Sequence, residues 1–176
     1  MTVRAAILIV SDRCARGEAA DETGPIVREM LMEAGAEVLE LVVVPDESGR
    51  IQAELARLAD RTGADVVITS GGTGLGPRDV TPEATEAVLH RRVPGIAEAM
   101  RALSLASAPN AMLSRGVAGL RGTTLIVNLP GSPRGARECL EIVLPVLDHA
   151  VRMVAGGGHD PEAPGDGGTI LGAGRR

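Results

Sequence analysis

Polar and apolar positions follow two different periods along the chain. Short apolar runs at residues 5–10, 37–44, 65–70 and 123–128 are typical of strands that are buried in a sheet. The stretches between them repeat apolar residues every three or four positions, which is the pattern of an amphipathic helix. The sequence therefore predicts strands that alternate with helices over most of its length.

Small and polar residues mark where the predicted helices begin and end. We expect one helix to open at Thr23 and to end at Gly35, and a second, capped by Ser48, to end at Gly63. Further helices are expected at residues 82–90, 94–105 and 133–154.

The last predicted helix contains two informative residues besides its apolar face. Ser132 is placed to cap its first turn, just ahead of Pro133 at the first helical position. We expect Pro145 to kink this helix or to end a segment of it. Residues 107–121 are ambiguous, and their pattern is compatible with a short helix and a short strand.

Alternating strands and helices indicate the α/β class, with a mostly parallel sheet covered on both faces. A chain of 176 residues fits one domain with a substantial core, which we expect to span residues 1–154. Residues 155–176 are rich in Gly and Pro and are expected to form a flexible C-terminal tail.

A parallel sheet places the carboxyl ends of all its strands on one edge, where ligands of α/β proteins bind. The segments that follow the four predicted strands are 11–13, 45–47, 70–79 and 128–133. We therefore expect carboxylates, hydroxyls and two glycine-containing loops to meet along this edge.

The longest of these segments lies within residues 69–85, which read TSGGTGLGPRDVTPEAT. Four glycines leave backbone N–H groups open to a ligand, and a helix start follows them, so the segment favours an anion. It lacks the Gly-Lys-Ser/Thr of a Walker loop and the third glycine of the dinucleotide fingerprint. A phosphate-binding loop of another kind and a plain glycine-rich turn both remain open.

Two carboxylates of the expected edge, Asp46 and Asp79, suit Mg²⁺. This ion prefers one or two carboxylates together with phosphate oxygens and water. The alternatives are that Asp46 is a turn residue after Pro45, and that Asp79 pairs with Arg78 or bonds the backbone ahead of Thr81.

A second anion site is expected where the fourth strand meets the last helix, at residues 128–132, although a plain strand-to-helix turn also fits. Ser114 and Arg115 form either a phosphate-facing pair or part of an exposed loop.

Composition narrows the classes of function. The chain has no Phe, Tyr or Trp, so it cannot stack nucleic-acid bases on aromatic rings, and its net charge of −5 disfavours a duplex-binding face. It has no lysine, which excludes Schiff-base and P-loop lysine chemistry.

The cysteines and the lengths of the apolar runs indicate the cellular compartment in which we expect the protein. Cys14 and Cys139 form no zinc or CxxC pattern, and we expect both to be free thiols in a reducing compartment. No apolar run approaches the ~20 residues of a membrane span, and we expect a cytoplasmic protein that binds neither membrane nor nucleic acid.

Several separated motifs, in this order, resemble one family, the molybdopterin-binding proteins of molybdenum cofactor biosynthesis. The resemblance covers about residues 3–154 and is carried by SDRCARGEAADETGP, TSGGTGLGPRDVTPEAT, PGIAEAM, MLSRG and GLRGTTLIVNLPGSPRGARECLEIVLP. The family includes the molybdopterin adenylyltransferases and the G domain of gephyrin.

The resemblance implies a three-layer α/β/α sandwich that assembles as a homotrimer. It implies Mg²⁺-dependent transfer of AMP from ATP to the terminal phosphate of molybdopterin, with release of pyrophosphate. The product is expected to pass to a downstream molybdate insertase.

The resemblance implies catalytic and metal-binding roles for Asp46 and Asp79. Together with the expected edge of the sheet, it gives candidate substrate contacts at Ser11, Asp12, Ser70, Gly71, Gly72, Thr73, Gly74, Thr81, Ser114, Asn128, Pro130, Gly131 and Ser132.

Two other functions are compatible with the same fold. The chain could be a module that binds molybdopterin without chemistry, although the presence of both Asp46 and Asp79 argues against this. A detached homologue of the insertase domain is the weakest alternative, because insertases are usually longer chains.

Overall fold

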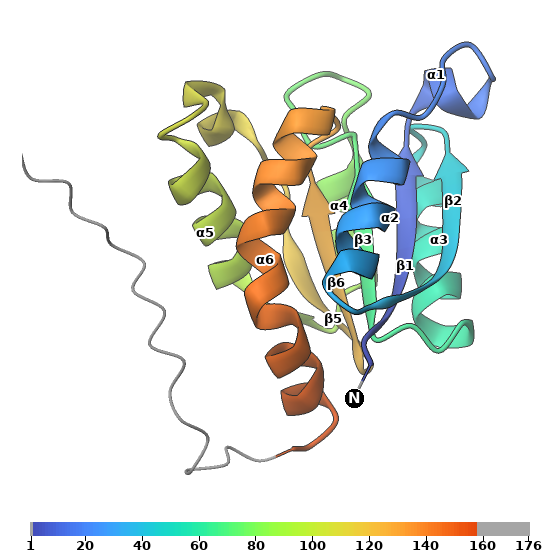
Figure 1. Cartoon of the computed structure of the whole chain (residues 1–176). Helices are drawn as coiled ribbons and strands as arrows, with labels where there is room; N and C mark the ends of the chain where they lie inside the picture. The colour runs from blue at the N-terminus through green and yellow to red at the C-terminus, as the bar shows by residue number, and fades with distance from the viewer. Residues whose placement is uncertain (1, 158–176) are drawn as a thin grey trace, which may run out of the picture.

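The computed structural model describes residues 2–157, which fold into alternating strands and helices as the sequence predicts (Figure 1). The strands are β1 (Arg4–Val10), β2 (Glu37–Val44), β3 (Val66–Ser70), β4 (Arg91–Arg92), β5 (Ala118–Arg121) and β6 (Thr124–Leu129). The helices are α1 (Asp12–Ala15), α2 (Thr23–Glu33), α3 (Ser48–Arg61), α4 (Thr81–Val88), α5 (Pro94–Ser104), the 3₁₀ helix η1 (Pro109–Leu113) and α6 (Pro133–Val154).

The strands form one six-stranded sheet in the order β2-β1-β3-β6-β5-β4. The four strands β2, β1, β3 and β6 pair in parallel, and β5 and β4 continue the sheet in antiparallel pairing. The predicted α/β class with a mostly parallel sheet is confirmed.

Helices cover the two faces of the sheet and make three layers, with α2, α5 and α6 on one face and α3 and α4 on the other (Figure 1). Alternate residues of β1 point to opposite faces, as a strand's period of two requires. Thus Ile7 packs with α2 and α6, whereas Leu8 packs with α3. Both are fully buried, which explains why β1 is a continuous apolar run.

The local details differ from the expectations at three points. Ser48 is the first residue of α3 rather than its cap, since Glu47 occupies the cap position and Ser48 Oγ accepts a bond from Gln52 Nε2 at 2.9 Å. Helix α6 runs without a break through Pro145, so this proline does not end a segment, and the kink stays a prediction. The two-residue strand β4 has no apolar run that would predict it.

Other local predictions are confirmed. Ser132 caps α6 by accepting a bond from the Gly135 N–H at 3.1 Å. The ambiguous residues 107–121 hold η1 and β5, a short helix and a short strand. The expected tail at 155–176 lies outside the described residues from position 158 onward. No helix within residues 2–157 is long and apolar enough to cross a membrane.

Gly71 lies at the point where β3 ends between its two neighbouring strands. Its φ is +108°, and its N–H donates to Leu129 O at 3.3 Å. A Cβ atom built on Gly71 would lie 2.1 Å from the backbone oxygen of Val10. Only glycine fits here, because any side chain would push β1 and β3 apart at the edge where their loops begin.

We predict that Gly71→Ala lowers the free energy of unfolding by roughly 2–4 kcal/mol, through strain in the backbone and the clash with Val10. Gly49 is a matched control, because it lies in the first turn of α3 with no atom within 4 Å of a built Cβ. Gly49→Ala should leave stability unchanged or raise it by about 0.5 kcal/mol. Denaturant unfolding of both variants tests this, and equal midpoints would show that the crowding at Gly71 is unimportant.

Candidate functional site

The carboxyl ends of the four parallel strands meet at one edge of the sheet, as predicted, and hydrogen bonds tie their loops together. Ser70 Oγ, at the end of β3, donates to Pro130 O at 2.8 Å, and Thr23 Oγ1 donates to Gly131 O at 3.1 Å. On the other side, the Ser11 N–H donates to Val44 O at 2.9 Å. Segments that are far apart in the sequence therefore form one continuous surface.

Two adjoining cavities open at this edge and share Gly72 and Gly131 in their walls. The first has a volume of about 560 Å³ and the second about 420 Å³. Cavities of this size are typical of small-molecule sites. Two ligands can therefore lie side by side, separated by little more than glycine backbone.

The first cavity lies between the glycine loop after β3 and the helices α5 and α6. Nine of the candidate residues line it: Gly72, Thr73, Gly74, Asp79, Ser114, Asn128, Pro130, Gly131 and Ser132.

The second cavity lies between the loops after β1, β2 and β3. Candidate residues in its wall are Ser11, Asp46, Ser70, Gly71, Gly72 and Gly131. Asp46 and Asp79 thus line different cavities, one on each side of the shared glycine wall.

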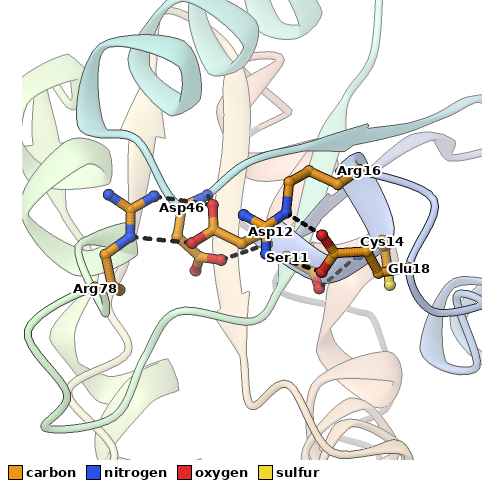
Figure 2. Close-up of polar contacts among 7 residues, drawn as sticks. All are labelled: Ser11, Asp12, Cys14, Arg16, Glu18, Asp46 and Arg78. Carbon is orange, nitrogen blue, oxygen red and sulfur yellow. Dashed lines mark hydrogen bonds and ion pairs between the residues drawn. The ribbon is translucent and has the colours of Figure 1, made fainter.

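Asp46 is held in place by a reciprocal pair of bonds with Asp12 (Figure 2). The Asp12 N–H donates to Asp46 Oδ2 at 2.7 Å, and the Asp46 N–H donates to Asp12 Oδ1 at 3.1 Å. Arg78, from the glycine loop, closes the arrangement by donating to both carboxylate oxygens of Asp12, at 2.9 and 3.0 Å. The side chain of Asp12 is therefore engaged by protein partners and lines neither cavity.

The pKa values of these two carboxyls are shifted in opposite directions. The hydrogen bonds from Arg78 lower the pKa of Asp12 below its ordinary value. Partial burial raises the pKa of Asp46, and the nearby negative charges of Asp12 and Asp79 act in the same direction, against the bond from the Asp12 N–H. Ionised Asp46 is therefore a source of unfavourable energy in the folded protein.

The Asp79 carboxylate bonds to the backbone of its own loop. Its Oδ2 accepts a bond from the Gly76 N–H at 2.7 Å. Built Cβ atoms on Gly74 and Gly76 would lie 2.9 and 2.8 Å from the same oxygen. The glycines at these two positions thus leave room for the carboxylate of Asp79.

Thr81 lies beneath the shared wall and lines neither cavity. A Cβ on Gly72 would lie 2.3 Å from Thr81 Oγ1 and 3.1 Å from Asp46 Oδ1. Among the buried side chains of residues 2–157, Thr81 Oγ1 is the polar atom without a hydrogen-bond partner. An unpaired buried hydroxyl costs energy, so a polar group that reached Thr81 Oγ1 at this wall would be bound favourably.

Asn128 lines the first cavity, and its side-chain amide makes three of its four possible hydrogen bonds to protein partners. The amide donates to Thr69 Oγ1 and Thr85 Oγ1, both at 3.0 Å, and accepts from the Val117 N–H at 3.2 Å. Asn128 therefore joins β6, β3, α4 and the start of β5 beneath the cavity floor.

Sequence reasoning missed the wall of the first cavity opposite the glycine loop. Met100 and Arg101 of α5, Leu113 of η1 and the buried thiol of Cys139 all lie there. The quoted motifs PGIAEAM, MLSRG and GLRGTTLIVNLPGSPRGARECLEIVLP contain Met100, Leu113 and Cys139, and Arg101 follows the first of them. Nothing in these residue types signals a ligand site, so only the folded chain shows that they share one wall.

The fold and the site define the class of protein. The chain belongs to the family described as the probable molybdopterin binding domain, which matches residues 6–149.

Relatives with known names agree with this assignment. The chain is 42% identical over 157 residues to the molybdopterin adenylyltransferase of Helicobacter pylori, with 88% of this chain and 89% of that protein covered. It is 41% identical over 158 residues to gephyrin of Dictyostelium discoideum, with 84% of this chain and 22% of that longer protein covered. The resemblance inferred from the motifs is confirmed.

A solved structure supports the fold. The molybdopterin biosynthesis enzyme MoaB from Thermus thermophilus is 55% identical and superposes with a TM-score of 0.84. The match covers 88% of this chain and 98% of that one.

We predict that Asp46→Asn stabilises the ligand-free protein at neutral pH, because it removes a charge whose pKa the fold raises. The gain should be about 2 °C in Tm at pH 7.5. It should vanish as the pH falls below about 4, where the carboxyl is protonated in the folded and unfolded protein alike.

Asp60 is the matched control, because its bonds with Arg121 lower its pKa. Asp60→Asn should lower the Tm slightly at pH 7.5, the opposite sign. Thermal unfolding across pH measures both variants, and a lower Tm for Asp46→Asn at pH 7.5 would contradict the electrostatic account.

Proposed function

We propose that this protein is a molybdopterin adenylyltransferase. It transfers AMP from ATP to the terminal phosphate of molybdopterin and releases pyrophosphate. The observation that carries the proposal is the pair of cavities that adjoin across Gly72 and Gly131 at the sheet edge. The printed names of the adenylyltransferase relatives supply the reaction.

The reaction makes few chemical demands on the protein. The terminal phosphate of molybdopterin attacks the α-phosphorus of ATP, a new P–O–P bond forms, and pyrophosphate leaves with the bonding electrons. No nucleophile is needed from the chain, so catalysis comes from alignment and charge stabilisation. Two cavities that share Gly72 and Gly131 suit this task, because ligands bound in them could bring their phosphates into contact at the edge of these glycines.

The residues at the wall fit a magnesium ion. Asp46 and Asp79 offer carboxylates on its two sides, and the unpaired hydroxyl of Thr81 lies, like Asp46 Oδ1, next to Gly72. No three acidic, histidine or cysteine side chains gather into a metal cluster within residues 2–157. This agrees with an ion that takes one or two carboxylates and completes its shell with phosphate oxygens and water. When bound, Mg²⁺ would neutralise charge on the transferred phosphoryl group and on pyrophosphate.

The site must hold two heterocycles without aromatic side chains, since the chain has none. In the first cavity, the Met100 thioether and the Arg101 guanidinium offer polarizable and planar surfaces instead. Arg101 is fixed by donating to Gly116 O at 3.0 Å, which keeps its plane in the wall.

A non-catalytic molybdopterin-binding module is the second candidate. The position of Asp46 and Asp79 on either side of the shared wall favours the enzyme, because a module that only held molybdopterin would have no use for a metal–nucleotide site. Calorimetric titration with ATP and Mg²⁺ discriminates between them, and an absence of nucleotide binding would favour the module.

The setting of the reaction follows from its chemistry. The adenylylated product needs an acceptor, and a molybdate insertase is the class of enzyme that we propose to consume it.

We also propose a homotrimer in the cytoplasm, as the resemblance implies. Sedimentation of the purified chain tests the oligomeric state.

We predict that Asp79→Asn keeps the fold but lowers AMP transfer by about 100-fold or more, because a charge that stabilises the transferred phosphate through Mg²⁺ is lost. Asn still offers an oxygen to the Gly76 N–H. Incubation with molybdopterin, ATP and Mg²⁺, followed by chromatographic detection of adenylylated molybdopterin, measures the effect.

Asp148→Asn is the control, since Asp148 lies on α6 and pairs with Arg152 away from both cavities. It should keep wild-type activity. Full activity of Asp79→Asn would remove this residue from the proposed site, and an inactive wild-type protein that still binds molybdopterin would favour the module.

A further inference from the structure

Arg115 makes four hydrogen bonds to the segment between Thr73 and Glu83. Its backbone N–H donates to Thr73 O at 2.9 Å, and its Nε donates to Gly74 O at 2.7 Å. Its Nη2 donates to Asp79 O at 2.5 Å, and its Nη1 pairs with Glu83. One residue from outside the glycine loop therefore bonds to both ends of it.

The guanidinium lies behind the loop and not in the first cavity. Gly74, Asp79 and the neighbouring Ser114 line that cavity, whereas Arg115 lines a separate, open groove together with Glu83, Glu86 and Arg92. A phosphate in the first cavity would meet the other side of the loop. Of the Ser114–Arg115 pair, Ser114 therefore lines the first cavity and Arg115 does not.

Arg115 adds to the other contacts of this loop, which are the pairing of Arg78 with Asp12 and the bonds between Asp79 and Gly76. Gly74 and Gly76 carry no side chain, and Leu75 between them is 66% exposed, so it does not anchor the loop in the core. The planar fork of an arginine can bond to two carbonyl oxygens at a fixed separation. By bonding to both Gly74 O and Asp79 O, Arg115 fixes the distance between these two carbonyl oxygens and therefore the shape of the loop between them.

We propose that Arg115 is a positioning residue that holds the 74–79 loop in the shape that keeps Asp79 in the wall of the first cavity. It touches no substrate and acts through Asp79. The inference rests on the proposed AMP transfer for its kinetic test, but the shape of the loop can be measured without it.

Arg115→Lys tests the role, because it keeps the charge and loses the fork. We expect kcat to fall about ten-fold, as for residues that orient a metal-binding group. The Mg²⁺ concentration for half-maximal rate should rise, and the KM for molybdopterin should stay within two-fold. Arg92→Lys is the control, since Arg92 lies in the same groove and pairs with Glu86 without contacting the loop. It should behave as the wild-type protein.

The Asp79→Asn background separates positioning from a general structural role. If Arg115 acts through Asp79, Arg115→Lys should cause no further loss of AMP transfer when Asp79 is already Asn. An additional ten-fold loss in the double variant would overturn the proposal. A raised KM for molybdopterin with unchanged kcat would also overturn it, because that result identifies a phosphate ligand.

Amide hydrogen exchange provides a readout independent of activity. Arg115→Lys should speed exchange across residues 74–79, including the Gly76 amide that bonds to Asp79, while β1 and β3 stay protected. Unchanged exchange in the loop would overturn the proposal whether or not the wild-type protein transfers AMP. A wild-type protein without AMP transfer would instead refute the proposed function, and the exchange result would still decide the role of Arg115.

Discussion

The candidate site depends on the parallel pairing of β2, β1, β3 and β6, because only that pairing brings the loops after all four strands to one edge. The strands must also end close together. Gly71 permits this, since its backbone turns with φ of +108° directly against Val10. The thin wall between the two cavities is a consequence of this crowding, as it consists of backbone where side chains have no room.

The second constraint is electrostatic. Burial is the main cause of the raised pKa of Asp46, and the neighbouring charges of Asp12 and Asp79 add to it, so ionised Asp46 is unfavourable in the ligand-free protein. The charge of Arg78 offsets part of this energy, whereas Arg115 supports the loop. Arg78 pairs with Asp12 in front of the wall, while Arg115 bonds to the loop backbone behind it. The carboxylates of Asp46 and Asp79 are left without a cationic partner among these contacts, which suits residues whose partner is proposed to arrive with the substrate.

Local patterns predicted much of this fold because its central strands are buried on both faces and therefore read as continuous apolar runs. They also placed Asp46 and Asp79 at one edge, because that follows from parallel strands alone. The patterns failed where long-range contacts decide. The strand β4 exists only through its pairing with β5, and no local pattern indicates that Asp12 pairs with Arg78, 66 positions away. The far wall of the first cavity, with Met100 and Arg101, was missed because its residues come together only in the folded chain.

In the proposed reaction, two ligands meet at the shared glycines and AMP passes from one to the other. Tracing isotopic phosphorus from ATP through a single incubation with molybdopterin and Mg²⁺ tests this most directly. The account predicts that label from the α-phosphorus appears in the molybdopterin product and that label from the γ-phosphorus appears in pyrophosphate. Label from the γ-phosphorus on molybdopterin, or tight binding of both ligands with no transfer of label, would contradict it.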